Sequence, residues 1–212
     1  PAAWPPDWAF VAAALEGDSE RAAALVAGDD VVAAYNRAVL VGGDWSGIAA
    51  AAEGDLAVLA ATARFSVGDT DEPPSAQASA GEVAAVARSA RASAALEHGD
   101  VPTALAELDA GTSAAAAAGS PLLAATLRGS KAELLRHTLD DPAGAEAEAT
   151  AALALLPTPA PEELAAELLV TRAMARQQQG GARPDLLTAA VADYLEALRV
   201  YREETHPELF AT

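Results

Sequence analysis

Residues 121–157, PLLAATLRGSKAELLRHTLDDPAGAEAEATAALALLP, carry the pattern of one helical hairpin. Their apolar spacing predicts a first helix over 122–138 and a second over 143–156, with a corner between them. Asp141 should cap the second helix, because its carboxylate accepts hydrogen bonds from the free N–H groups of a first turn. Pro142 fits the first position of that helix, where no N–H is needed. The stretch therefore predicts two antiparallel helices.

Each predicted helix of this hairpin has an apolar stripe that the other helix can cover. The stripes consist of Leu123, Leu127 and Leu134 on the first helix and of Ala145, Ala149, Ala152 and Leu156 on the second. A single hairpin leaves much of its apolar surface in water, so it requires stacked neighbours. The rest of the chain should supply them.

Alanine supplies most of the apolar content of this 212-residue chain, because hydrophobic residues make up 52% and aromatic residues only 4%. Alanine has the highest helix propensity and a small side chain, which favours helices packed at close approach. No run shows the sustained alternation of β-branched residues that is typical of strands. The sequence predicts an all-α fold.

A glycine-aspartate pair recurs through the first half of the chain. Glycine adopts the left-handed conformation that ends a helix, and aspartate caps the next helix. The pairs are Gly17-Asp18, Gly28-Asp29, Gly43-Asp44, Gly54-Asp55, Gly68-Asp69 and Gly99-Asp100. All of these pairs except Gly68-Asp69 have helical patterns on both sides and are predicted hinges. With these hinges, the sequence predicts short helices over 8–16, 19–27, 30–41, 45–53 and 55–66.

Residues 68–81, GDTDEPPSAQASAG, interrupt the helical pattern with two prolines, small polar residues and three acids. They bury little, so we interpret them as a linker between an array of short helices over 1–67 and longer hairpins over 82–212. The longer helices are predicted over 82–98, 101–118, 161–179 and 185–203, besides the hairpin quoted above. The corners of the three hairpins, at Gly99, Leu139 and Gly180, are 40 and 41 residues apart. A fixed period of this length predicts an α-solenoid of stacked antiparallel hairpins.

The balance of charge limits the classes of partner. The chain has 31 acidic and 13 basic residues, a formal net charge of -18. This charge repels phosphate backbones and anionic lipids, so neither nucleic acid nor a membrane is an expected partner. Cysteine is absent, which excludes disulfides and thiolate metal sites. No apolar run reaches the ~20 residues that span a bilayer and no secretory signal is recognisable, so we expect a cytoplasmic location.

The predicted second helices share a pattern of small and large residues that ends in proline. It is carried by Ala104 and Leu108, by Ala145, Ala149, Ala152 and Pro157, and by the run Tyr194-Leu195-Glu196-Ala197-Leu198-Arg199-Val200-Tyr201. This pattern resembles the second helices of tetratricopeptide repeats, and the resemblance covers residues 82–207. It implies a solenoid that binds a protein partner, with 203–212 opening a further repeat. A generic α-solenoid is the alternative.

Basic residues recur along the predicted first helices at intervals of 40 or 41 residues, and stacked helices would align them as a ladder. In tetratricopeptide proteins the first helices line the groove, and some members bind a partner's acidic C-terminus through basic residues there. The resemblance therefore implies an acidic peptide or protein partner, held by carboxylate contacts. The predicted partner-binding residues are Arg88, Arg91, Arg128, Lys131, Arg172 and Arg176.

A second interpretation of this basic ladder is structural. In a chain with so many acids, the same cations can neutralise carboxylates on the neighbouring helices. The candidate acids are Glu107, Asp109, Glu146 and Glu148. The sequence leaves both interpretations open.

Self-association is an alternative function. A helix that ends an array with an apolar outer face should bury that face against a second copy. The residues predicted for this contact are Val191, Tyr194, Leu198 and Tyr201, which would make the chain an assembly module and a homo-oligomer.

An all-α enzyme or metalloprotein is the third possibility. Glu203 and His206 match half of a di-iron motif, but a second such motif is absent from the sequence. Asp140, Asp141, Glu146 and Glu148 form the other acidic group that suggests a metal. His98 and His137 fall at predicted helix ends, where a cation complements the helix dipole. No nucleophile, base and phosphate-binding pattern can be assembled, so we expect no enzymatic activity and no cofactor.

Overall fold

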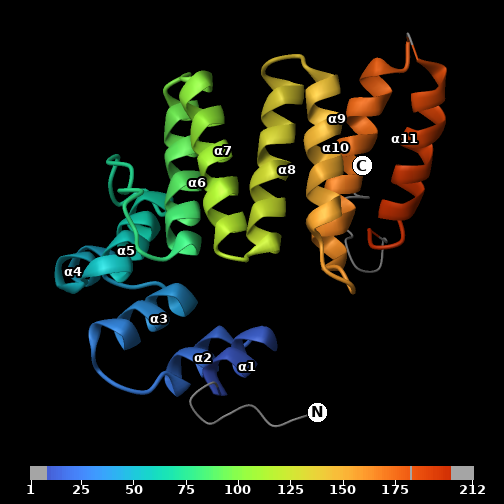
Figure 1. The fold of residues 1–212 in the computed structure, drawn as a ribbon. Helices are drawn as coiled ribbons and strands as arrows, with labels where there is room; N and C mark the ends of the chain where they lie inside the picture. Colours follow the sequence, from blue (N-terminus) through green and yellow to red (C-terminus); the bar gives the residue numbers. More distant parts are fainter. Residues whose placement is uncertain (1–8, 182, 202–212) are drawn as a thin grey trace. The chain divides into compact units, whose positions relative to one another are not determined.

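A computed structural model describes residues 9–181 and 183–201, which form helices and connecting loops without a strand (Figure 1). The predicted all-α fold is confirmed for this part of the chain. Two compact units, residues 1–91 and 92–212, make up the chain. Within the described residues, no helix is both long and apolar enough to cross a lipid bilayer.

The described part of the first unit contains five short helices and the beginning of a sixth. They are α1 (Ala9–Leu15), α2 (Ser19–Leu25), α3 (Val31–Val41), α4 (Trp45–Ala51) and α5 (Gly54–Ser66), followed by α6 (Gly81–Glu97). The second unit contains longer helices, namely α7 (Val101–Ala117), α8 (Pro121–His137), α9 (Pro142–Leu155), α10 (Glu162–Gln179) and α11 (Pro184–Ala197). Nearly all ends lie within two residues of the predicted positions.

The end of α11 is the exception, because it lies at Ala197 and the sequence predicts a helix to residue 203. The N–H of Arg199 bonds to the carbonyl of Glu196, and that of Val200 bonds to the carbonyl of Ala197. These bonds between residues three apart tighten the last turn and end the α-helix. Residues 202 and 203 lie outside the described residues.

Aspartates cap several helices as predicted. Asp18, Asp44 and Asp100 each precede a helix and accept a hydrogen bond from its first turn. Asp141 caps α9 in the same way, with its Oδ1 2.9 Å from the N–H of Gly144. In the second hinge Asp30, rather than Asp29, caps α3, because it directly precedes the first turn. The capping prediction is therefore confirmed at Asp18, Asp44 and Asp100 and shifted by one residue at the second hinge. It is wrong at Gly54-Asp55, because α5 begins at Gly54 and Asp55 binds Ser79 and Ala80 instead of capping the helix.

The loop between α5 and α6 is tied to α5. The Asp55 carboxylate accepts hydrogen bonds from the Ser79 N–H at 2.6 Å, the Ser79 hydroxyl at 2.7 Å and the Ala80 N–H at 2.8 Å. The bond from the Ser79 hydroxyl, followed by the two backbone bonds, lowers the pKa of Asp55. The loop and the beginning of α6 belong to the first compact unit, which ends at Arg91. The division into an array over 1–67 and hairpins over 82–212 stays a prediction.

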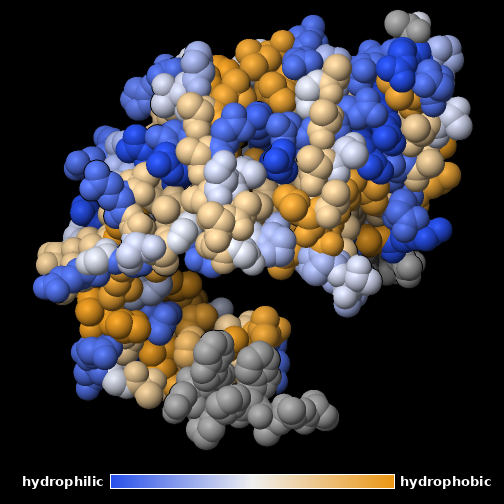
Figure 2. All heavy atoms as spheres, viewed as in Figure 1, coloured by the Kyte–Doolittle hydropathy of each residue, from blue (hydrophilic) through white to orange (hydrophobic). Residues whose placement is uncertain are grey.

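Alanine contacts hold the second unit together. Each helix from α8 to α11 packs on the one before it, and α10 also contacts α8. Figure 1 shows α7 to α11 standing side by side, and in Figure 2 pale bands of weakly hydrophobic residues alternate with hydrophilic ones on the visible face of this unit. Two buried clusters join α8, α9 and α10; one is Ala132, Ala145, Ala149 and Ala175, and the other is Ala125, Ala152 and Leu168. The burial predicted for Leu127, Leu134, Ala145, Ala149 and Ala152 is confirmed.

The core of the first unit is built around the hairpin of α3 and α4. Buried Trp45 and Ile48 of α4 pack with Ala38 of α3 and Ala60 of α5. The rings of Tyr35 and Trp45 meet edge to face, with centroids 5.6 Å apart. Hydrophobic residues also gather on the surface over α3 (Figure 2), including exposed valines on that helix.

Candidate functional site

A groove runs between α8 and α10, the first helices of two successive hairpins. Its volume is about 810 Å³. The wall from α8 consists of Thr126, Gly129, Ser130, Glu133 and Arg136; the wall from α10 consists of Leu164, Glu167, Leu168, Val170, Thr171 and Met174; Tyr201 completes the lining. We call this site the α8–α10 groove.

Gly129 sets how closely the walls of the groove approach. A Cβ atom at this position would lie 2.9 Å from Cδ2 of Leu168, so only glycine fits without a shift of that side chain. The α10 wall is mainly apolar, and Met174 is exposed on it. The groove therefore offers apolar surface to another molecule.

A polar network occupies the α8 wall. Glu133 accepts hydrogen bonds from the Thr171 hydroxyl at 2.6 Å and from Arg136 Nη2 at 2.7 Å, and His137 Nε2 lies 3.1 Å from its carboxylate. Burial raises the pKa of Glu133, but the bonds from Thr171 and Arg136 and the charges of Arg136 and His137 outweigh it and lower the pKa overall. The carboxylate is thus held ionised between α8 and α10.

Arg136 is the buried member of this network. Its side chain is only 7% exposed, and its Nη2 contacts Glu133 and the His137 ring. Among the described residues, the buried Nε has no hydrogen-bond acceptor. An unsatisfied buried donor costs about 1–3 kcal/mol, so the groove wall holds a donor that an acceptor would stabilise.

Two glutamates lie on the same side of α10, one of them in the groove lining. Glu167 lines the groove and Glu163 is one turn earlier; both are exposed, and neither forms an ion pair or hydrogen bond within the described residues. Burial, and then the charges of Glu167 and Glu163, raise the pKa of the neighbouring Tyr201. These two carboxylates leave the α10 side of the groove negative.

The four predicted ladder cations of α8 and α10 lie away from this groove. Helical residues advance by roughly 100° each, which places Arg128 and Lys131 on the side of α8 opposite Ser130 and Glu133. On α10, Arg172 and Arg176 likewise point away from Glu167 and Met174. The interval of 40 or 41 residues does place corresponding cations on successive first helices. However, the cations of α8 and α10 face the second helices of the hairpins.

Carboxylates of α7, α9 and α11 pair with the four ladder cations of α8 and α10. Arg128 Nη1 lies 2.5 Å from Glu148, and Lys131 Nζ lies 2.9 Å from Glu148 and 2.5 Å from Asp109. Burial lowers the pKa of Lys131, but its bonds to Asp109 and Glu148 raise it overall. This pairing favours the structural interpretation of the ladder.

Asp193 of α11 joins two of these cations. Its carboxylate accepts bonds from Arg172 Nε at 2.9 Å, Arg172 Nη2 at 2.7 Å and Arg176 Nη1 at 2.8 Å. Arg176 Nε also donates to Glu146 at 2.8 Å. Asp193 was not among the acids that the sequence suggested, although it lies 21 residues after Arg172.

Arg88 and Arg91 belong to α6, in the part of that helix that falls in the first unit. Arg91 Nη1 lies 3.4 Å from the carbonyl oxygen of Pro74 in the preceding loop. The partner-binding role of all six predicted basic residues stays a prediction.

The four residues predicted for self-association differ in how exposed they are. Val191 of α11 and Leu198, which directly follows α11, are 57% and 51% exposed, and Leu187 and Leu195 continue the same exposed ridge. Tyr194 is half-buried and donates from its hydroxyl to Gln177 Oε1 at 3.0 Å. Tyr201 lies in the α8–α10 groove instead. We call Leu187, Val191, Leu195 and Leu198 the α11 ridge.

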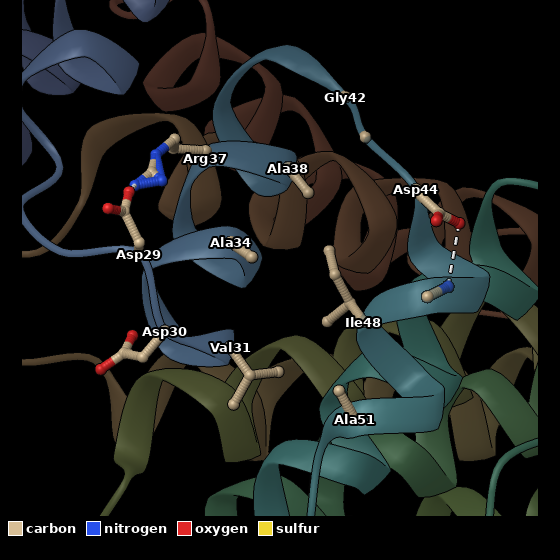
Figure 3. Close-up of a pocket in the computed structure, with 12 residues that line it drawn as sticks. Asp29, Asp30, Val31, Ala34, Arg37, Ala38, Gly42, Asp44, Ile48 and Ala51 are labelled. Carbon is tan, nitrogen blue, oxygen red and sulfur yellow. Dashed lines mark hydrogen bonds and ion pairs between the residues drawn. The ribbon is translucent and has the colours of Figure 1, made fainter.

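A second hollow, of about 460 Å³, lies between α3 and α4 in the first unit. Figure 3 shows Val31, Ala34, Ala38, Ile48 and Ala51 around it, with the Asp29–Arg37 pair at the rim. Asp30 and Asp44 also border it, but they cap α3 and α4. The hollow therefore has an apolar floor, and two of its rim carboxylates already serve the helix ends.

The other candidate residues have structural surroundings. Within the described residues, no three metal-binding side chains come together. Asp141 caps α9, while Glu146 and Glu148 pair with cations. His98 follows α6, with its Nδ1 2.7 Å from the Ala94 carbonyl oxygen. Glu203 and His206 lie outside the described residues.

The residues of the α8–α10 groove are not among those predicted from the sequence. The signal that was available is the spacing of Glu163, Glu167, Val170 and Met174, which places two acids and two apolar side chains on one side of a helix. That pattern is weak because alanines occupy the remaining faces.

Comparison with protein-family models, with curated proteins and with solved structures gives no match.

Proposed function

We propose that the chain is a non-catalytic protein-interaction module, a tetratricopeptide-like helical array that binds a peptide or protein partner in the α8–α10 groove. The observation that supports it is the groove itself. It is open, about 810 Å³ in volume, and combines exposed apolar side chains with polar groups that lack partners among the described residues. A helix or extended segment docked between two helices uses this kind of surface.

The α10 wall should supply most of the affinity. Apolar surface removed from water contributes about 25 cal/mol per Å², and full burial of a methionine side chain contributes roughly 1.5–3 kcal/mol. Met174 is already partly covered, so a docked segment should gain about 1 kcal/mol from it. Ladder contacts should contribute less, because a carboxylate of the partner would have to displace Glu148 or Asp193.

Met174→Gln should weaken peptide binding about fivefold, because it replaces an exposed apolar side chain in the groove by a polar one of similar length. The measurement is fluorescence polarisation with a peptide selected against the wild-type chain from a random display library. Arg128→Gln, which changes the most exposed of the four paired ladder cations, should leave the affinity within twofold. A peptide that tolerates Met174→Gln but is lost with Arg128→Gln would reverse this assignment in favour of the ladder.

Self-association is a second candidate function, favoured by the α11 ridge. The preceding second helix, α9, is covered by α10. No described helix covers α11 in that way, and Leu195 is 61% exposed on its outer side. A second copy that packs on the α11 ridge would continue the stacking found between α9 and α10.

Val191→Asp combined with Leu195→Asp should abolish any dimer that forms through the α11 ridge, because the dimer would have to bury two carboxylates without partners. Sedimentation equilibrium over a hundredfold range of concentration gives the mass of both proteins. Arg183→Asp is the control, because Arg183 is exposed and lies just before the same helix. This substitution should leave the mass unchanged. A wild-type chain that stays monomeric throughout the range would exclude this function.

A further inference from the structure

The charge of the α8–α10 groove is set by very few groups. Glu133 and Arg136 neutralise each other at 2.7 Å, so their pair contributes little net charge. The remaining charged group in the lining is Glu167, with Glu163 one turn away on the same helix. Like charges four residues apart destabilise a helix slightly, so the pair favours a cation between them.

The other cations of α8 and α10 cannot easily serve this purpose. Arg128, Lys131, Arg172 and Arg176 lie on the opposite sides of their helices and are paired there with Glu146, Glu148, Asp109 and Asp193. Glu167 in the groove lining and Glu163 one turn before it are thus two carboxylates that no described side chain neutralises. The chain as a whole is also acidic, with a formal net charge of -18.

The buried Arg136 Nε is an independent sign of a missing partner. It belongs to a groove-lining residue, and no acceptor for it is found in the part of the chain that the structure describes. Buried donors are nearly always satisfied, and a backbone carbonyl of a bound segment is the commonest acceptor available. A peptide with a cationic side chain offers both groups that the groove lacks.

We propose that the α8–α10 groove selects a basic amphipathic peptide segment, whose apolar side chains pack on Leu164, Val170 and Met174 while its lysine or arginine pairs with Glu167 and Glu163. This inference rests on the proposed function. It replaces the acidic partner that the ladder suggested, because the ladder cations are paired elsewhere. Residues 202–212 of the chain itself fit poorly as the occupant, because they contain three glutamates and one arginine.

The test begins with a phage library of random 12-residue peptides selected against the whole chain at physiological salt. Selected peptides are sorted by whether Met174→Gln weakens their capture. Among those that depend on Met174, we expect lysine and arginine to exceed acids clearly. An acidic or neutral composition in that group would overturn the charge inference and leave groove binding intact. A selection in which no peptide depends on Met174 would contradict both.

A matched pair of charge variants separates the groove from the general acidity of the chain. Glu163→Gln with Glu167→Gln and Asp71→Asn with Glu72→Gln each remove two exposed acids, so the two proteins have equal net charge. A synthetic copy of the leading basic peptide should bind the groove variant at least tenfold more weakly than wild type and the loop variant within twofold. Equal weakening by both variants would show unspecific attraction and overturn the proposal.

Discussion

Replacing Asp193 with alanine should lower the free energy of unfolding by about 2–4 kcal/mol. The aspartate is 6% exposed and receives three hydrogen bonds from Arg172 and Arg176. Without it, two guanidinium groups remain close together in a largely buried place. Removing one partner of a buried ion pair usually costs roughly 3–5 kcal/mol. The expected loss here is somewhat smaller, because Arg176 keeps its ion pair with Glu146.

Asp109→Ala is the matched control for this prediction. It removes the same side chain from a ladder pair, but Asp109 is 60% exposed and its partner Lys131 keeps Glu148. The expected loss is below about 1 kcal/mol, as for exposed pairs in general. Urea denaturation followed by circular dichroism measures both variants. Equal losses would show that Asp193 does not connect α10 and α11 energetically.

Helix positions could be predicted from sequence because their signals are local. A glycine that ends one helix and an aspartate that caps the next need only a few neighbouring residues, as Gly99 and Asp100 show. The same holds for Asp141 and Pro142 at the start of α9. These contacts join residues that are close together in the sequence, so the sequence pattern contains them.

The orientation of each helix about its axis could not be predicted in the same way. Alanine is compatible with both buried and exposed faces, so α8 and α10 show little contrast between their sides. The period of the cations is visible in the sequence, but whether they face a groove or the next helix depends on where α9 and α11 pack. The groove side, with Glu167 and Met174, therefore emerged only with the structure.

The contacts of the loop between α5 and α6 also depended on tertiary structure. Residues 68–81 have the composition of a linker, yet Asp55 binds Ser79 and Ala80, and Asp69 accepts from Ser46 at 2.9 Å and from Arg64 at 3.0 Å. Each of these bonds joins the loop to α4 or α5. A polar composition predicts an irregular backbone, but it does not predict which helix that backbone will bind.

Ala149→Leu should be the most damaging of the single substitutions considered, with a loss of about 3 kcal/mol or more in the free energy of unfolding. Ala149 is fully buried and packs with Ala132, Ala145 and Ala175, so it lies where α8, α9 and α10 meet. Three added carbon atoms find no space among methyl groups on fixed helices. Overpacking a core typically costs about 1–3 kcal/mol, and here the helices themselves must move.

Ala147→Leu is the control, because Ala147 lies two residues away on the same helix and is exposed. Its effect should stay within about 0.5 kcal/mol, as for most surface substitutions. Denaturant unfolding of both variants gives the difference. A loss no larger for Ala149→Leu than for Ala147→Leu would mean that α8, α9 and α10 are not in contact through alanine. If these helices are in contact through alanine, the leucine at position 149 should push α8 and α10 apart and widen the α8–α10 groove. Any Ala149→Leu protein that still folds should then bind the selected peptide more weakly than the Ala147→Leu protein does.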